Sequence, residues 1–304
     1  MRDVTIARLL TLGAAAAVLA GAAPARAGTA VPPVRWRTAA PGLERAELAL
    51  DDAAVARGLG LARTPRVRLV LIRLDPARHT VRLDAAVEPD GRLSPWHVGR
   101  APAAAVLAMN AGQYTDEGPW GWVVHHGREL QAPGSGALAS ALVATRDGRV
   151  RVLDRVELDS ARATGGVAEA LQSYPALLVG EGELPGELRA GGAGVDLEHR
   201  DGRLAVCELR DGRLLVALTR WATTGGAGRL GAVPEGLTVP EMAAAMGALD
   251  CRRARLLDGG LSAQLRVRSA SGGTEEWPGL RRVPVGVVAV ARAAAATALA
   301  ARPR

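Results

Sequence analysis

The stretch RLLDGGLSAQL, Arg255 to Leu265, decides how this chain is organised. Its leucines end a buried strand, Asp258 lies where that strand emerges, and an alternating segment follows as a second strand. Gly259 and Gly260 permit positive φ and let backbone N–H groups approach an anion such as phosphate, and Ser262 adds a hydroxyl. The alternative is a plain tight turn, because Asp-Gly is among the commonest hairpin sequences.

Length and composition favour a folded, globular protein. The 304 residues are 48% hydrophobic and 23% charged, which is enough for one large core or two smaller ones. The formal net charge is +7, but every basic residue is arginine and alanine is abundant, a bias typical of GC-rich coding. The arginines are scattered without interleaved aromatic residues, which argues against nucleic-acid binding.

Residues 1–27 have the pattern of a secretory signal peptide. Two arginines precede an apolar stretch, and Ala25 to Ala27 is a small-x-small cleavage signal. The alternative, a membrane anchor, is disfavoured because the apolar core is rich in alanine and no basic cluster follows it. We therefore expect a bacterial protein that is secreted or periplasmic, with a mature chain starting near Gly28 and no stable membrane insertion.

The remaining pattern predicts a sheet-rich α+β fold with few helices, in a single compact catalytic-type domain. We expect this domain over residues 67–290, after an N-terminal tether and first element over 28–66 and before an alanine-rich tail over 291–304. The expected strands are 67–74 with 80–87 as its hairpin partner, 103–109, 139–143 paired with 149–153, 204–209 paired with 214–218, and 283–290.

Helices and loops are fewer. A short helix is expected at residues 166–170, and the clearest helix begins at Thr238, because Thr238 and Glu241 form a capping box. This cap explains Glu241 better than a second catalytic acid does. The glycine-rich stretch 223–231 is interpreted as a mobile flap, since it lacks the strand-to-helix context of a nucleotide loop.

A second buried strand opens into a loop at Asn110, in the same layout as at Asp258. In that loop Trp120 either stacks on the apolar face of a sugar ring or fills a core, and Trp122 has the same two interpretations. Further along, Cys207 either pairs with the second cysteine in a disulfide, which export would permit, or is buried as a small apolar side chain.

The sequence does not predict a metal site or a cofactor. His125 and His126 are adjacent and are expected to point to opposite faces of a strand or turn, which makes them a poor metal pair. A divalent cation near Asp116, Glu117 and Asp196 is possible but unsupported by ligand spacing.

Three blocks of residues occur in an order typical of one family. They are Met109 to Tyr114 with Pro119 and Gly121, Arg203 to Val206 with Asp211 to Arg213, and Gly236 to Thr238 with Glu241 to Ala243 and Leu257 to Ser262. Together they resemble the phosphodiester glycosidase family over roughly residues 67–290. The departures are Gln113 and Tyr114 in place of an aromatic pair, Cys207 where the family usually has glycine, and Leu261 in place of a third glycine.

The resemblance implies an exported hydrolase that cleaves the bond between a GlcNAc-like sugar and a phosphodiester. This reaction needs a carboxylate near the anomeric carbon, and cations or N–H groups on the departing phosphate. The resemblance makes Asp258 the carboxylate, Arg203 the phosphate clamp and Asn110 the ligand of a sugar hydroxyl or N-acetyl group. The further substrate-binding residues that we expect are Gly259, Gly260, Ser262 (which would orient Asp258), His199, Arg200, Gly112 and Trp120.

Two alternatives belong to other functional classes. A non-catalytic binder of anionic cell-wall or surface glycans would use the same residues without turnover. A serine hydrolase using Ser262 is disfavoured, because no Gly-x-Ser-x-Gly motif surrounds it. The partner that we expect is therefore a glycan or a sugar-1-phosphodiester.

Overall fold

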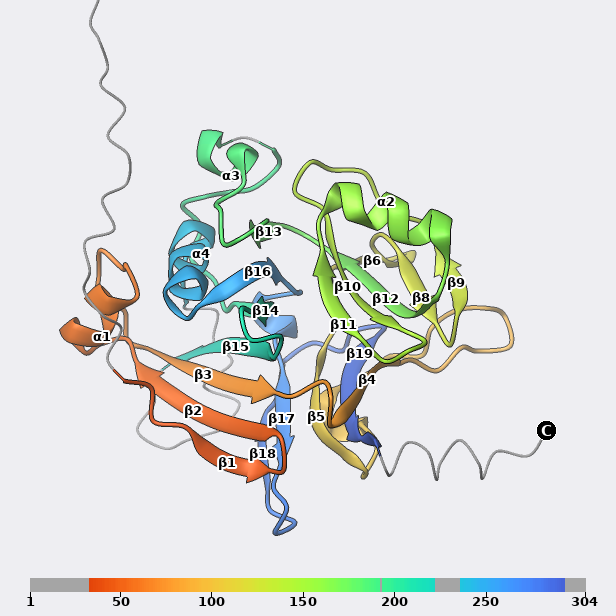
Figure 1. The fold of residues 1–304 in the computed structure, drawn as a ribbon, viewed down its shortest axis with the longest axis horizontal. Coiled ribbons are helices and arrows are strands. Elements are labelled where there is room, and N and C mark those ends of the chain that lie inside the picture. The colour runs from red at the N-terminus through yellow and green to blue at the C-terminus, as the bar shows by residue number, and fades with distance from the viewer. Residues whose placement is uncertain (1–32, 192, 222–235, 293–304) are drawn as a thin grey trace, which may run out of the picture.

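A computed structural model describes residues 33–191, 193–221 and 236–292, which form three large antiparallel sheets and a few short helices (Figure 1). The expected signal peptide, the expected flap at 223–231 and the tail from residue 293 lie outside the described residues. Within the described part, no helix is long and apolar enough to cross a membrane.

The seven-stranded sheet has the order β1-β2-β3-β15-β14-β16-β13. Its strands are β1 (Arg37–Ala40), β2 (Leu43–Ala49), β3 (Val67–Leu74), β13 (Ala176–Leu178), β14 (Leu204–Leu209), β15 (Leu214–Trp221) and β16 (Cys251–Leu256). Along β3, Val70 and Ile72 face one core whereas Leu69 and Leu71 face another. This sheet is therefore buried on both faces, which explains why its strands are so continuously apolar.

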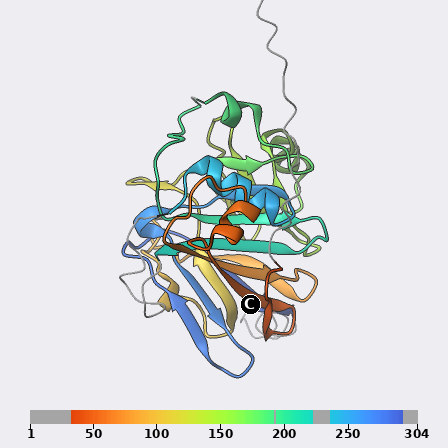
Figure 2. The ribbon, with the colours of Figure 1, turned by 90° about the vertical axis from the view of Figure 1, so that its left-hand side faces the viewer.

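Helices α1 (Ala53–Gly58) and α4 (Val239–Ala248) cover one face of that sheet, and Figure 2 shows them in front of it. The other face contributes to the largest core, which also includes side chains from the two five-stranded sheets. Cys207 and Cys251 form a disulfide between the neighbouring strands β14 and β16. Of the two alternatives for the cysteines, the structure thus has the disulfide.

Two five-stranded sheets complete the fold, with the orders β11-β10-β12-β8-β9 and β18-β17-β5-β19-β4. The first contains β8 (Val123–His125), β9 (Arg128–Gln131), β10 (Ser140–Thr145), β11 (Val150–Leu153) and β12 (Val167–Ser173). The second contains β4 (His79–Asp84), β5 (Ala105–Asn110), β17 (Leu265–Arg268), β18 (Thr274–Trp277) and β19 (Gly286–Ala291). The smaller elements are the ribbon β6 (Tyr114–Thr115) and β7 (Gly118–Pro119), helices α2 (Arg155–Thr164) and α3 (Gly186–Ala190), and 3₁₀ turns η1 (Val98–Arg100) and η3 (Gly260–Ser262).

The sheet-rich α+β class and the single compact domain are confirmed. The hairpins β10–β11 and β14–β15 form as predicted, and α4 begins at Thr238 with the predicted capping box. The N-terminal segment differs from the expected tether, because the chain enters the seven-stranded sheet at Arg37.

Two local predictions are wrong. The segment 80–87 is not the partner of β3: β3 lies between β2 and β15, and β4 pairs with β19 in another sheet. Residues 166–170 are not helical but begin β12, where pairing with β10 and β8 overrides the helix-forming alanine and glutamate residues. The helix lies just before, as α2, with a capping box of Asp154 and Glu157.

Candidate active site

Three segments that are far apart in the sequence meet beyond the end of β16. The backbone N–H of Asp258 donates to the carbonyl of Ala111 at 3.1 Å, just after β5. The Asn110 side chain donates to the Asp258 carbonyl at 2.8 Å. On the other side, the N–H of Gly260 donates to the carbonyl of Gly202 at 2.7 Å, just before β14. The candidate residues Asn110, Arg203 and Asp258 therefore come from adjoining segments.

Asp258 has the electrostatic environment of a functional carboxylate. Burial raises the pKa of Asp258, and the nearby carboxylate of Asp201 raises it further. Hydrogen bonds from the Ser262 hydroxyl and the Gly259 N–H to the carboxylate, and the charge of Arg281, act in the opposite direction. A carboxyl group whose burial and neighbours oppose each other in this way is a reasonable candidate for proton transfer or nucleophilic attack.

Asp201 is a second carboxylate of this site that the sequence reasoning missed. Its side chain is 22% exposed. One carboxylate oxygen accepts the N–H of Gly202 at 2.8 Å, and the other would lie 2.8 Å from a Cβ added at Gly260. A signal was present in the sequence, because Asp201-Gly202 precedes β14 as Asp258-Gly259 follows β16.

The paired glycines have a different role from the one expected. The N–H of Gly259 binds the Asp258 carboxylate, and the N–H of Gly260 binds the Gly202 carbonyl. Neither N–H is directed at a ligand in this arrangement. Their small size is needed instead, since a Cβ at Gly259 would lie 2.5 Å from the Gly202 carbonyl oxygen and Gly260 has a φ of +56°.

Arg203 lies just before β14, and two nitrogens of its guanidinium donate to backbone carbonyls. Its Nε donates to the Leu237 carbonyl at 2.8 Å and one Nη donates to the His199 carbonyl at 2.7 Å. Burial lowers the pKa of Arg203, while the carboxylates of Asp201 and Asp196 raise it. These bonds orient the guanidinium, and they leave its other Nη for an anion.

Asn110 is fully buried and its amide is used by the backbone. Besides the bond to Asp258, its Nδ2 donates to the Ala111 carbonyl at 3.0 Å and its Oδ1 accepts the N–H of Gln264 at 2.9 Å. These bonds leave it poorly placed to contact a sugar, which differs from the expectation. The geometry supports a positioning role, in which Asn110 ties the end of β5 to the turn that carries Asp258.

The neighbouring basic residues are in two different states. The side chain of His199 is 62% exposed, with its Nε2 3.8 Å from Asp201, so it remains available to a ligand. Arg200 instead forms an ion pair with Glu241 at 2.5 Å and also donates to the Gly236 carbonyl. It therefore supports the N-terminus of α4, and Glu241 also caps that helix.

Gly112 and Trp120 belong to the loop after β5. Gly112 is buried, and a Cβ there would lie 2.7 Å from the Gln172 carbonyl, so close packing against β12 explains the glycine. Trp120 is partly exposed and packs edge-on against Tyr174, with ring centroids 6.1 Å apart. Trp122 is 2% exposed, which supports the core-filling interpretation for that residue.

The structure also has a hollow of about 1090 Å³. It is lined in part by the loop 87–95, the ribbon β6–β7, strand β9 and Arg282. Arg281, the residue before Arg282 in the chain, is exposed. Its charge lowers the pKa of Asp258, so Arg281 is a further cation of the site, which the sequence did not predict. Asp116 and Glu117, named above for a divalent cation, line this hollow, but none of the expected catalytic or substrate-binding residues does.

Residues 103–290 match the family model described as NAGPA: Phosphodiester glycosidase. The chain is similar to the catalytic domain of zebrafish N-acetylglucosamine-1-phosphodiester alpha-N-acetylglucosaminidase (NAGPA), auto-inhibited by its pro-peptide, at 18% identity and a TM-score of 0.60, over 85% of this chain and 88% of that one. It is also similar to a hypothetical protein from Synechocystis, at 14% identity and a TM-score of 0.52, over 86% and 64%. No curated protein matches significantly. At these identities, the two structural matches show that this chain shares the fold of those proteins.

Proposed function

The chain belongs to the phosphodiester glycosidase family, and from this premise we propose that it is an exported hydrolase that cleaves the glycosidic bond between a GlcNAc-like sugar and a phosphodiester. The observation that carries the proposal is that the segments bearing two carboxylates, Asp258 and Asp201, adjoin at the hydrogen bond between Gly260 and Gly202, so that the charge of Asp201 acts on Asp258. Most glycoside hydrolases use such a pair of carboxyl groups, with positive charge developing at the anomeric carbon in the transition state.

Each carboxylate has a part in this proposal. Asp258 acts as the base that activates water or as the nucleophile, and the hydroxyl of Ser262 orients it. Asp201 stabilises the positive charge that develops on the sugar. Because a phosphodiester is a good leaving group, the departing oxygen has little need of a strong general acid.

The departing phosphate requires cations. The Nη of Arg203 that is not bound to a backbone carbonyl is one candidate, because the other two nitrogens hold the guanidinium in a fixed orientation. Arg281 and His199 are exposed beside the two carboxylates and are the other candidates. Cations in these positions would favour a substrate that carries its negative charge next to the scissile bond.

The direct experiment is to incubate the purified protein with several GlcNAc-1-phosphodiesters, including a nucleotide sugar, and to measure free GlcNAc. We expect release with turnover. Saturable binding of the same compounds with no sugar release would instead support the alternative, a non-catalytic binder of anionic glycans. Release of sugar phosphate rather than free sugar would show that the protein cleaves a phosphate ester bond, which contradicts the proposal.

A further inference from the structure

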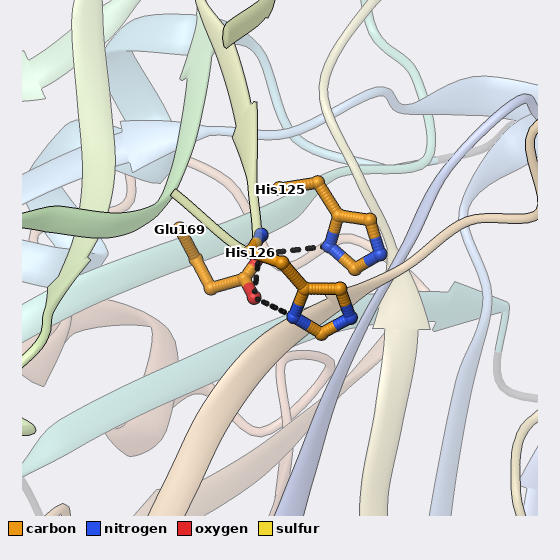
Figure 3. Close-up of side chains that lie close together, drawn as sticks. All are labelled: His125, His126 and Glu169. Atoms are coloured by element: carbon orange, nitrogen blue, oxygen red, sulfur yellow. Dashed lines mark hydrogen bonds and ion pairs between the residues drawn. The ribbon is translucent and has the colours of Figure 1, made fainter. Parts of the chain in front are cut away.

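His125, His126 and Glu169 lie together at the tip of the β8–β9 hairpin, and none of them belongs to the candidate active site described above (Figure 3). The Nδ1 of His125 is 2.9 Å from one Glu169 carboxylate oxygen, and the Nδ1 of His126 is 3.3 Å from the other. One atom from each residue can be chosen so that all three lie within 4.8 Å of one another.

The turn places both imidazoles on the same side, which corrects the expectation that they point to opposite faces. His126 has a φ of +52° and Gly127 a φ of +75°, the combination that a two-residue type I′ turn requires. Alternation between faces therefore ends at His125. The two rings lie against each other, with centroids 3.9 Å apart.

The spacing of these atoms suits a metal ion. Zinc binds histidine nitrogen and carboxylate oxygen at about 2.0–2.2 Å, so two ligands are about 2.9 Å apart at a right angle and about 3.3 Å apart at a tetrahedral angle. The two nitrogen–oxygen distances at this cluster, each to a different oxygen of Glu169, are 2.9 and 3.3 Å, and one donor atom from each of the three residues lies within 4.8 Å of the others. The three side chains are therefore close enough to bind one ion after they draw together.

The carboxylate is held in place before any ion binds. Glu169 has a side chain that is only 9% exposed, and its oxygens accept the N–H groups of Leu83 and His126, each at 3.3 Å. Among the described residues, no arginine forms an ion pair with it. A buried carboxylate that faces two imidazoles can gain a compensating charge from a divalent cation.

The position of the cluster indicates what an ion would do there. Glu169 belongs to β12, its histidine neighbours belong to the β8–β9 hairpin, and Leu83 lies on β4 at the edge of the other five-stranded sheet. The side chain of His126 is 45% exposed, which gives water access to the remaining coordination positions. An ion would therefore fasten the hairpin to β12 beside the junction of two sheets.

We propose that His125, His126 and Glu169 form a binding site for one divalent transition-metal ion of the zinc type. Imidazole nitrogen together with carboxylate oxygen is a donor set that suits zinc, and water completes the coordination. The ion stabilises the folded protein, because it binds the assembled cluster and not the unfolded chain.

The test uses the purified protein after chelator treatment and dialysis, titrated with Zn²⁺ by calorimetry and with Co²⁺ by visible absorption. We expect one ion per chain and a thermal midpoint that rises with Zn²⁺ concentration. His126→Asn removes one ligand at an exposed turn where asparagine tolerates the positive φ, and Glu169→Gln removes the carboxylate charge. We expect each variant to bind Zn²⁺ about 10- to 100-fold more weakly than the wild-type protein does.

The matched control is His97→Asn, the same substitution at a histidine outside the cluster. It should bind Zn²⁺ as the wild-type protein does. Absence of stoichiometric binding by the wild-type protein would overturn the proposal, as would unchanged affinity in a folded His126→Asn variant. Circular dichroism establishes that each variant is folded, and because His126 is exposed the test does not depend on the buried Glu169.

Discussion

Replacing Asn110 by alanine tests whether this residue is a positioning residue or a substrate ligand. The substitution leaves the N–H of Gln264 and the carbonyl of Asp258 without their hydrogen-bond partner, in a position that is fully buried. Each unsatisfied buried group costs about 1–3 kcal/mol, so the free energy of unfolding should fall by about 2–6 kcal/mol. The carbonyl of Ala111 retains the N–H of Asp258 and adds little to this loss.

The assay is denaturant unfolding followed by circular dichroism, with the slope compared between proteins to show that the unfolded states are alike. Thr115→Ala in the following loop is the matched control, and as an exposed position it should change the stability by no more than about 0.5 kcal/mol. A stability loss below about 1 kcal/mol, together with a large rise in KM, would refute the positioning role and restore the interpretation of Asn110 as a sugar ligand.

Three further predictions follow from contacts around the site and the disulfide. The Ser262 hydrogen bond lowers the pKa of Asp258, so Ser262→Ala should move the acid limb of the kcat/KM profile to higher pH; an unmoved limb would contradict this. Replacing both disulfide cysteines by serine removes a cross-link between residues 44 apart in the sequence, which should lower the free energy of unfolding by about 4 kcal/mol in a denaturant titration. A loss under about 1 kcal/mol would contradict this stabilising role of the disulfide. Gly260→Ala and its control Gly212→Ala both place an alanine in the left-handed region, at a cost of about 1–2 kcal/mol. Only the new Cβ at Gly260 would lie 2.8 Å from the Asp201 carboxylate, so Gly260→Ala should lose more stability and more activity than the control. Equal losses in the two variants would count against that contact.

Local signals in the sequence predicted much of the fold. The alternation in Val67–Leu74 and the capping box at Thr238 each identify an element correctly, because the information lies within a few residues. The partner of β4 could not be found in this way, since it is β19, about 200 residues later in the chain. The residues at the start of β12 favour a helix locally, whereas pairing with two strands decides the structure there.

The order of the three blocks predicts that the segments carrying the candidate residues adjoin, but not the contacts between them. Asp258 and Arg203 come from segments that do adjoin, as the three blocks suggested. Asp201 stands between Arg200 and Arg203, the expected phosphate ligands, and its proximity to Asp258 depends on the contact between two backbone segments, which only the structure shows. The role of Gly260 was also misjudged, since only the structure shows which carbonyl its N–H binds.

The central claim is that Asp258 and Asp201 act together on a sugar-1-phosphodiester. The most direct measurement is kcat/KM for GlcNAc release by Asp258→Asn and by Asp201→Asn, beside Asp159→Asn as a control at an exposed carboxylate on α2. We predict a loss of about 100- to 10,000-fold for each of the first two variants and little change for the control, with all three proteins folded. Release at the wild-type rate by either Asp258→Asn or Asp201→Asn would contradict the account.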